Sequence, residues 1–174
     1  KVVGVWGNED YEEVRGRMRE ECSSILWLED EAVDVWVEGL RVRIVGTMGV
    51  LDEPTFWQRR SVPGIVETYR KRLGKIGEVL KEKSGDLTVL LTHYPPRCRT
   101  LTGEDVRFWR QMSSQRLTEI VKRGNVDIVV HGHLHKSTVH RDYIGNAVVY
   151  NVSLPATKSV TVIEPRRMGL MQFF

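Results

Sequence analysis

The sequence has little cysteine and no long hydrophobic run. Its only cysteines, Cys22 and Cys98, are too few for a disulfide framework, which favours a reducing cytoplasm. No apolar segment approaches the roughly 20 residues of a membrane-spanning helix, and no signal-peptide pattern is present. We therefore expect no membrane partner. Asn and Gln are scarce whereas Val, Arg and Glu are abundant, a balance that favours a thermophilic source.

Charge of one sign does not dominate either. The 26 Lys and Arg residues are interleaved with 23 Asp and Glu residues, which leaves a net charge of +3. This mixture permits an anionic substrate but lacks the basic patch of a nucleic-acid-binding protein, so nucleic acid is not an expected partner. With 174 residues, 41% of them hydrophobic, the chain is predicted to form one domain over residues 1–174.

What the sequence does contain is histidine at the ends of predicted strands. His131, His133 and His135 follow the apolar run 126–130, and His93 follows the run 87–92. Both runs are predicted buried strands, and ligands of open α/β sheets bind beyond the carboxyl ends of strands. In extended chain, His133 and His135 would point to the same side. One strand-end histidine is usually a surface residue, but the repeated placement favours a metal site.

A third polar group follows the first predicted strand, residues 2–6. Gly7, Asn8, Glu9 and Asp10 place an amide and two carboxylates at that strand end. The alternative is local: Asn8 as a turn former and Asp10 as the N-cap of a helix over 11–22. The chain begins with Lys1 rather than Met, and the strand starts at once, so we expect it to be part of something longer.

The remaining patterns predict the other elements. Apolar alternation predicts a hairpin of residues 33–37 and 40–47, and helical spacing predicts a core-facing helix over 65–80. Residues 51–63 are expected to form an irregular loop, and Thr102 to Asp105 resemble a capping box. Ser113 or Ser114 is expected to cap a helix that closes at Gly124. Short strands are expected at 138–141, 147–152 and 159–164, followed by an apolar tail, 168–174, that packs on the body or on another subunit.

Two arginines follow His93 closely. Arg97 and Arg99 could hold a substrate phosphate through bidentate hydrogen bonds. They are equally well explained as exposed surface charge, which is the usual place for arginine.

These motifs together resemble the calcineurin-like metallophosphoesterase family. The family pattern runs Asp-x-His, Gly-Asp, Gly-Asn-His-Asp/Glu, a separate His, and Gly-His-x-His, and the last three motifs occur here in this order. The resemblance implies an α/β fold, a two-sheet β-sandwich flanked by helices, with a dinuclear metal site at the strand ends. Asn8, His93 and His133 resemble ligands of one metal, and His135 resembles a ligand of the other. No role carries over to His131.

The departures from the family pattern concern the start of the site. The sequence has no Asp-x-His, and Gly85-Asp86 falls between a helix and a strand, where a turn is expected, so the bridging carboxylate and the first strand or strands are missing. Glu9 replaces the histidine that acts on the leaving group. The expected catalytic residues are therefore Glu9 and Asp10. An unpaired sheet edge would favour a homodimer or an upstream segment that covers it.

The resemblance implies a metal-dependent hydrolase of phosphomonoesters or phosphodiesters. Its substrate would be a phosphorylated small molecule or a nucleotide, and its cofactors two divalent ions, with Mn, Fe, Zn or Ni suiting the mixed N and O ligands. Two such ions lower the pKa of a bridging water and neutralise phosphate charge. The alternative is a catalytically deficient scaffold of the same fold that holds a partner through Trp57, Arg59 and Arg60, or the apolar tail.

Overall fold

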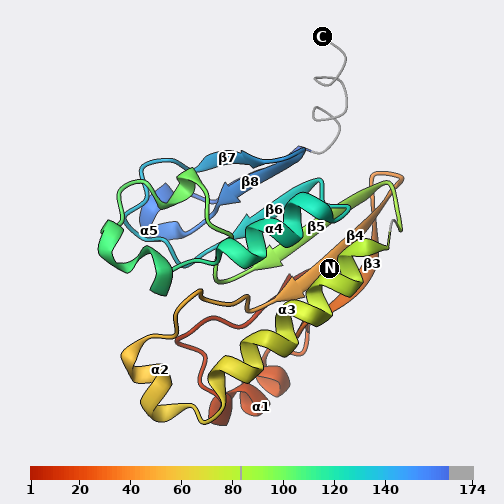
Figure 1. Cartoon of the computed structure of the whole chain (residues 1–174). Coiled ribbons are helices and arrows are strands. Elements are labelled where there is room, and N and C mark those ends of the chain that lie inside the picture. Colours follow the sequence, from red (N-terminus) through yellow and green to blue (C-terminus); the bar gives the residue numbers. More distant parts are fainter. Residues whose placement is uncertain (83, 165–174) are drawn as a thin grey trace.

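The computed structural model describes residues 1–82 and 84–164. The elements, drawn in Figure 1, are β1 (Val2–Gly4), α1 (Glu12–Glu21), β2 (Ile25–Trp27), β3 (Glu31–Val37), β4 (Leu40–Thr47), α2 (Phe56–Ser61), α3 (Ile65–Lys81), β5 (Leu87–Thr92), the 3-10 turns η1 (Arg99–Leu101) and η2 (Val106–Gln111), α4 (Gln115–Arg123), β6 (Ile128–His131), β7 (Arg141–Ile144), β8 (Ala147–Asn151) and α5 (Leu154–Thr157). The predicted tail, 168–174, lies outside the described residues.

A six-stranded mixed sheet forms the centre of the molecule, in the order β3-β4-β5-β6-β8-β7 (Figure 1). The four inner strands are parallel. At one edge β3 pairs antiparallel with β4, and at the other β7 pairs antiparallel with β8. The two strands that precede His93 and His133, β5 and β6, are neighbours in the same direction. Their carboxyl ends therefore meet at one edge of the sheet, as the sequence predicted.

The hydrophobic core lies between this sheet and two helices. Val45, Leu90, Val129 and Val149 form one row across the four parallel strands, and all are fully buried. They share a core cluster with side chains of α3 and α4, namely Ile76, Leu80, Leu117 and Val121. The amphipathic spacing of 65–80 is confirmed, because its apolar side faces this cluster. Ser114 caps α4 by accepting from the Leu117 amide, and the helix ends at Gly124.

The start of the chain forms a second, smaller sheet. β1 pairs parallel with β2, and the indole rings of Trp6 and Trp27 stack at 3.9 Å between centroids, with Trp6 just beyond the end of β1. Trp6 is only 1% exposed, whereas Val2 is 56% exposed. The first strand is thus half-exposed, whereas Trp6, which leads into Gly7 and Asn8, is buried.

Several local predictions were wrong. Residues 51–63 contain a helix, α2, which begins at a capping box formed by Thr55 and Gln58. The turn η2 is capped by Asp105 rather than opened by Thr102. The local alternative for Asp10 is not found either: the N-cap of α1 is Tyr11, and the Asp10 carboxylate accepts from the Gly7 amide. In each case a competing local hydrogen bond decided the boundary.

The C-terminal strands also differ from the prediction. β7 covers Arg141–Ile144 rather than 138–141, so only Gly145 and Asn146 connect it to β8. Gly145, with a φ of +59°, makes this tight turn favourable. Residues 159–164, although apolar and β-branched, form no strand. Gly85 and Asp86 form the expected turn, in which the Asp86 carboxylate accepts from the Arg41 amide.

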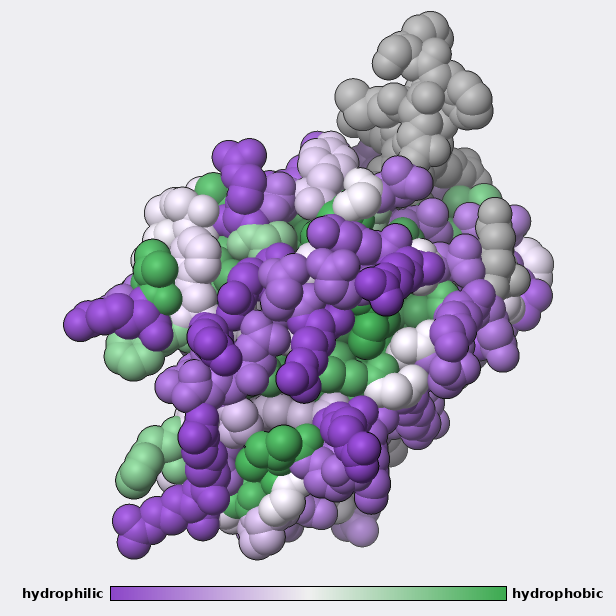
Figure 2. Space-filling view, in the orientation of Figure 1, coloured by the Kyte–Doolittle hydropathy of each residue, from purple (hydrophilic) through white to green (hydrophobic). Residues whose placement is uncertain are grey.

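Within the described residues, no helix is both long enough and apolar enough to cross a membrane. The face seen in Figure 2 is mostly hydrophilic, with hydrophobic side chains gathered in separate patches.

Candidate metal centre

A buried polar row ends the four parallel strands. Thr47, Thr92, His131 and Asn151 share one register and lie two residues beyond the apolar row of the core. All four side chains are buried. Thr92 Oγ1 donates to the Tyr94 carbonyl at 2.9 Å, and Asn151 Nδ2 donates to the Leu134 carbonyl at 3.0 Å. The row therefore holds the loops that carry the candidate ligands.

His131 belongs to this supporting row. Its Nε2 lies 3.0 Å from the Thr100 hydroxyl, and its Nδ1 lies 2.9 Å from the Gly132 carbonyl oxygen. Burial lowers the pKa of His131 to about 4, so the imidazole is neutral at pH 7. Both ring nitrogens are engaged in the protein interior, which agrees with the absence of a site role for this residue.

Three of the predicted metal ligands converge in front of the row. Asn8 Oδ1 lies 2.6 Å from His93 Nε2 and 3.1 Å from His133 Nδ1, and the imidazole rings contact each other at 4.9 Å between centroids. Asn8 and His133 are 125 positions apart in the sequence. The three residues come from the loops after β1, β5 and β6. The cluster offers one amide oxygen and two ring nitrogens at a single point.

Backbone geometry allows this convergence. A Cβ at position 7 would lie 2.9 Å from His93 Cε1 and Nδ1, so only glycine lets the loop approach that ring. His133 has a φ of +69°, which corrects the expectation of extended chain from His133 to His135. Non-glycine residues rarely adopt this conformation, and those that do cluster at functional sites.

The two imidazoles are neutral. Burial, followed by the repulsion between neighbouring histidines that protonation would create, lowers the pKa of His93 to about 4 and that of His133 to about 3. A neutral imidazole is the form that ligates metals, so neither ring carries a positive charge at pH 7 that would oppose an ion.

Tyr94 supports both imidazoles and was missed by sequence reasoning. Its buried ring meets His93 and His133 edge to face, at 5.1 Å and 4.9 Å between centroids. Its hydroxyl accepts from Gln58 Nε2 at 3.0 Å, which connects the cluster to α2. The sequence signal was its position directly after a strand-end histidine, where a buried aromatic residue can lock the ring.

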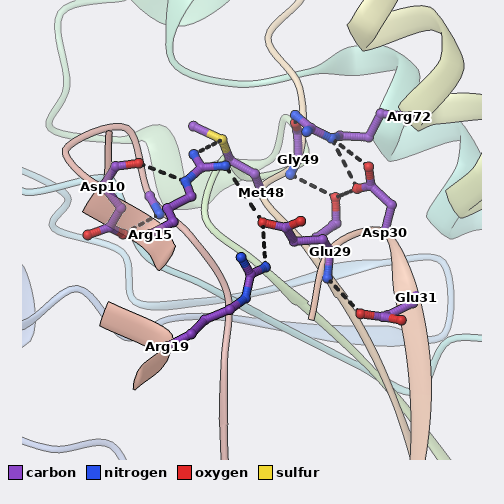
Figure 3. A network of polar contacts seen from close by, with 11 residues as sticks. Asp10, Arg15, Arg19, Glu29, Asp30, Glu31, Met48, Gly49 and Arg72 are labelled. Carbon is purple, nitrogen blue, oxygen red and sulfur yellow. Dashed lines mark hydrogen bonds and ion pairs between the residues drawn. The ribbon is translucent and has the colours of Figure 1, made fainter. Parts of the chain in front are cut away.

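A polar network holds the loop of Asn8 against the body (Figure 3). Asp10 Oδ2 accepts from the Gly7 amide at 2.7 Å, and Arg15 Nε donates to the Asp10 carbonyl at 2.9 Å. Arg15 continues to Glu29 at 3.7 Å. Next to it, Asp30 pairs with Arg72, which also donates to the Gly49 carbonyl. Asp10, predicted as catalytic, is thus placed where it shapes the loop.

The other predicted site residues lie around the cluster. Glu9 is exposed, and its Oε1 accepts from Asn8 Nδ2 at 2.6 Å, which orients the Asn8 oxygen toward the imidazoles. His135 is exposed and is one of the causes that lower the pKa of His93 and of His133. Across residues 1–82 and 84–164, no three His, Cys, Asp or Glu side chains gather as a metal-binding group. The donor set at hand is Asn, His and His, which suits one borderline divalent ion.

Within the part of the chain that the structure describes, neither Arg97 nor Arg99 forms a hydrogen bond or an ion pair with Asn8, His93 or His133. Arg97 forms an ion pair with Asp52 at 2.8 Å, and both arginines line an open cavity of about 540 Å³ between η1, α4 and β7. The Arg99 amide donates to Asp142, which also lines that cavity. Their role in phosphate binding stays a prediction.

Fold and site together define a class: an α/β protein in which imidazoles and an amide meet at the carboxyl edge of a mixed sheet. The model of the calcineurin-like phosphoesterase family matches residues 1–137. The chain belongs to this family, as its motifs predicted, and the predicted α/β fold is confirmed.

Solved structures agree on the fold. The chain is similar to the phosphopantetheinyl hydrolase PptH of Mycobacterium tuberculosis, with a TM-score of 0.63 and 16% identity, covering 89% of this chain and 69% of that one. It is also similar to the protein TT1561 of Thermus thermophilus, with a TM-score of 0.56 and 13% identity, covering 95% and 68%. The chain spans 56% and 52% of two further solved structures, about half their length. A search of curated proteins gives no match.

Proposed function

We propose that this chain binds a divalent metal through Asn8, His93 and His133 and belongs to a hydrolase of phosphomonoesters or phosphodiesters. The observation that carries the proposal is the meeting of Asn8 Oδ1 with one nitrogen of each imidazole, at 2.6 Å and 3.1 Å. These are donors of the Mn, Fe, Zn or Ni kind, and both imidazoles are neutral. His135, beside the cluster, is the proposed ligand of a second ion.

Divalent ions held by Asn8, His93, His133 and His135 would supply activation of water at neutral pH and neutralisation of phosphate charge. The chain's own residues would hold the ions and the loop. Asp10 keeps the Gly7–Asp10 turn closed, and Tyr94 fixes the planes of both imidazoles. Without these supports the donors would lose the geometry that ligation requires.

Glu9 in its protonated form is the proposed proton donor to the leaving group. It stands where the family has a histidine, it is exposed, and its Oε1 accepts from Asn8 Nδ2. A positioned acid contributes about 10²–10⁴-fold to such reactions. Glu9→Ala should therefore slow hydrolysis of a methyl phosphodiester, a poor leaving group, far more than that of a nitrophenyl ester, and equal effects on both would remove this role.

The proposal is tested by hydrolysis of bis(p-nitrophenyl) phosphate with and without added Mn²⁺. We expect Mn²⁺-dependent turnover that His133→Ala abolishes. The matched control is His140→Ala, because His140 bonds to the Ser137 carbonyl outside the cluster and should not be needed. Turnover that persists in His133→Ala would contradict the proposal. Absence of Mn²⁺-dependent turnover of both this diester and the monoester p-nitrophenyl phosphate would also contradict it and favour a scaffold.

A further inference from the structure

Three large aromatic side chains stand exposed at one end of the molecule. Tyr11 is 50% exposed, Phe56 78% and Trp57 54%. Tyr11 precedes α1 and the other two begin α2, and Figure 1 shows both helices at the same end of the fold. The Tyr11 and Trp57 rings meet at 6.2 Å between centroids with an angle of 61°. Over α2, hydrophobic atoms project from a mostly hydrophilic surface in Figure 2. We call these three residues the aromatic rim.

Two connections link the aromatic rim to the metal centre: the short stretch of chain from Asn8 to Tyr11, and the contacts from Trp57 through Gln58 to Tyr94. Tyr11 follows Asn8 by three residues, a reach of at most about 11 Å in extended chain. On the other side, Trp57 precedes Gln58, whose amide bonds to the Tyr94 hydroxyl, and Tyr94 packs on both imidazoles. The rim therefore belongs to the loop and the helix that carry and support the candidate ligands.

The rim is also held on a fixed backbone. Gln58 is buried and closes a capping box with Thr55. Its side-chain Oε1 accepts from the Thr55 backbone N–H at 3.0 Å, and its backbone N–H donates to Thr55 Oγ1 at 3.2 Å. The turn before Tyr11 is closed by Asp10. Exposed aromatic side chains on a fixed backbone lose little entropy when a ligand covers them, which is the property of a preorganised binding surface.

We propose that the aromatic rim is the specificity subsite of the phosphoesterase and binds a planar aromatic ring carried by the substrate. This rests on the proposed function, and it names the substrate class as nucleoside phosphates and their esters. In these molecules a sugar separates the ring from the phosphate, so the base would cover Tyr11, Phe56 or Trp57 while the phosphate lies at Asn8, His93 and His133. Aromatic side chains stack on any nucleobase, because every base has a π-face.

The first test compares two diesters with the same leaving group and charge: thymidine 5′-(p-nitrophenyl phosphate) and methyl p-nitrophenyl phosphate, each with Mn²⁺. We expect kcat/KM for the nucleoside ester to be at least about 10-fold higher, the effect of one base–aromatic contact. Trp57→Ala should bring this ratio toward one. Trp36→Ala is the matched control, because Trp36 is 73% exposed on β3 and takes no part in the rim. It should leave the ratio unchanged.

The outcomes separate the two proposals. If neither diester is hydrolysed, and the monoester p-nitrophenyl phosphate is not hydrolysed either, the proposed function fails. If both are hydrolysed at equal kcat/KM in the wild type, or if Trp57→Ala keeps the ratio, the subsite is wrong while the phosphoesterase stands.

A second readout does not depend on turnover. Quenching of tryptophan fluorescence by AMP, in the presence of Mn²⁺, should show binding at least about 10-fold tighter than for ribose 5-phosphate measured by competition. Equal affinities would overturn the subsite. A change of oligomeric state in Trp57→Ala, seen by size-exclusion chromatography, with unchanged AMP affinity would also overturn it and assign the rim to a protein interface.

Discussion

Replacing Gly7 by alanine tests how the centre is built. The added Cβ would lie 2.9 Å from His93 Cε1 and Nδ1, where ordinary contacts are 3.4–4 Å. The imidazole or the loop must therefore move by about half an ångström. This is as large as the displacement that the ligands of a functional site can undergo without loss of their geometry. Because Asn8 is the next residue and its Oδ1 lies 2.6 Å from His93 Nε2, the movement separates two donors of the metal centre.

The substitution is expected to weaken metal binding and folding by similar free energies. Overpacking of this kind costs about 1–3 kcal/mol of stability. Displaced support for a ligand typically costs about 10–100-fold in metal affinity. We expect calorimetric titration with Mn²⁺ to show a loss of this size in Gly7→Ala, with circular dichroism unchanged.

Gly16→Ala provides the matched control. Gly16 lies in α1, and a Cβ there meets nothing within 4 Å. This substitution should leave Mn²⁺ affinity unchanged and raise the free energy of unfolding by about 0.5–1 kcal/mol, the helix preference of alanine over glycine. Equal Mn²⁺ affinities in Gly7→Ala and Gly16→Ala would refute the steric account of the loop.

Three further predictions concern support and reactivity. Asp30→Asn should lower the free energy of unfolding in urea by about 2–3 kcal/mol, because it leaves the Arg72 guanidinium, only 17% exposed, without its carboxylate; an effect below about 0.5 kcal/mol would show that the pair is dispensable. Thr100→Val should cost about 1–3 kcal/mol by leaving His131 Nε2 buried without a partner, whereas Thr100→Ser should be close to wild type; a Thr100→Val protein as stable as the wild type would contradict this. Burial raises the pKa of the Cys98 thiol, so in Cys22→Ser at pH 8 it should react severalfold more slowly with Ellman's reagent than in the urea-unfolded chain, and equal rates would contradict its burial.

The sequence predicted the frame of the fold because its main signals are periodic. The apolar runs before His93 and His133 became neighbouring parallel strands, and the helical spacing of 65–80 became α3. The prediction failed where single hydrogen bonds compete with periodicity. Thr55 and Gln58 start a helix within a stretch rich in proline and arginine, and Asp10 closes a turn rather than capping α1.

The site was predicted in part for a similar reason. Motif residues at strand ends could be found from spacing, and three of them converge. The parts that support them come from distant segments and carry no spacing signal. Asn151 reaches the Leu134 carbonyl, and Gln58 reaches the Tyr94 hydroxyl, through contacts that exist only after the chain has folded.

The most direct test of the central claim is Mn²⁺ binding to the purified chain, measured by the electron paramagnetic resonance signal of the free ion. The account predicts at least one bound ion per chain, with affinity reduced at least about 10-fold in Asn8→Ala and His93→Ala and unchanged in His140→Ala. Absence of binding, or binding that both variants retain in full, would contradict a metal centre at Asn8, His93 and His133.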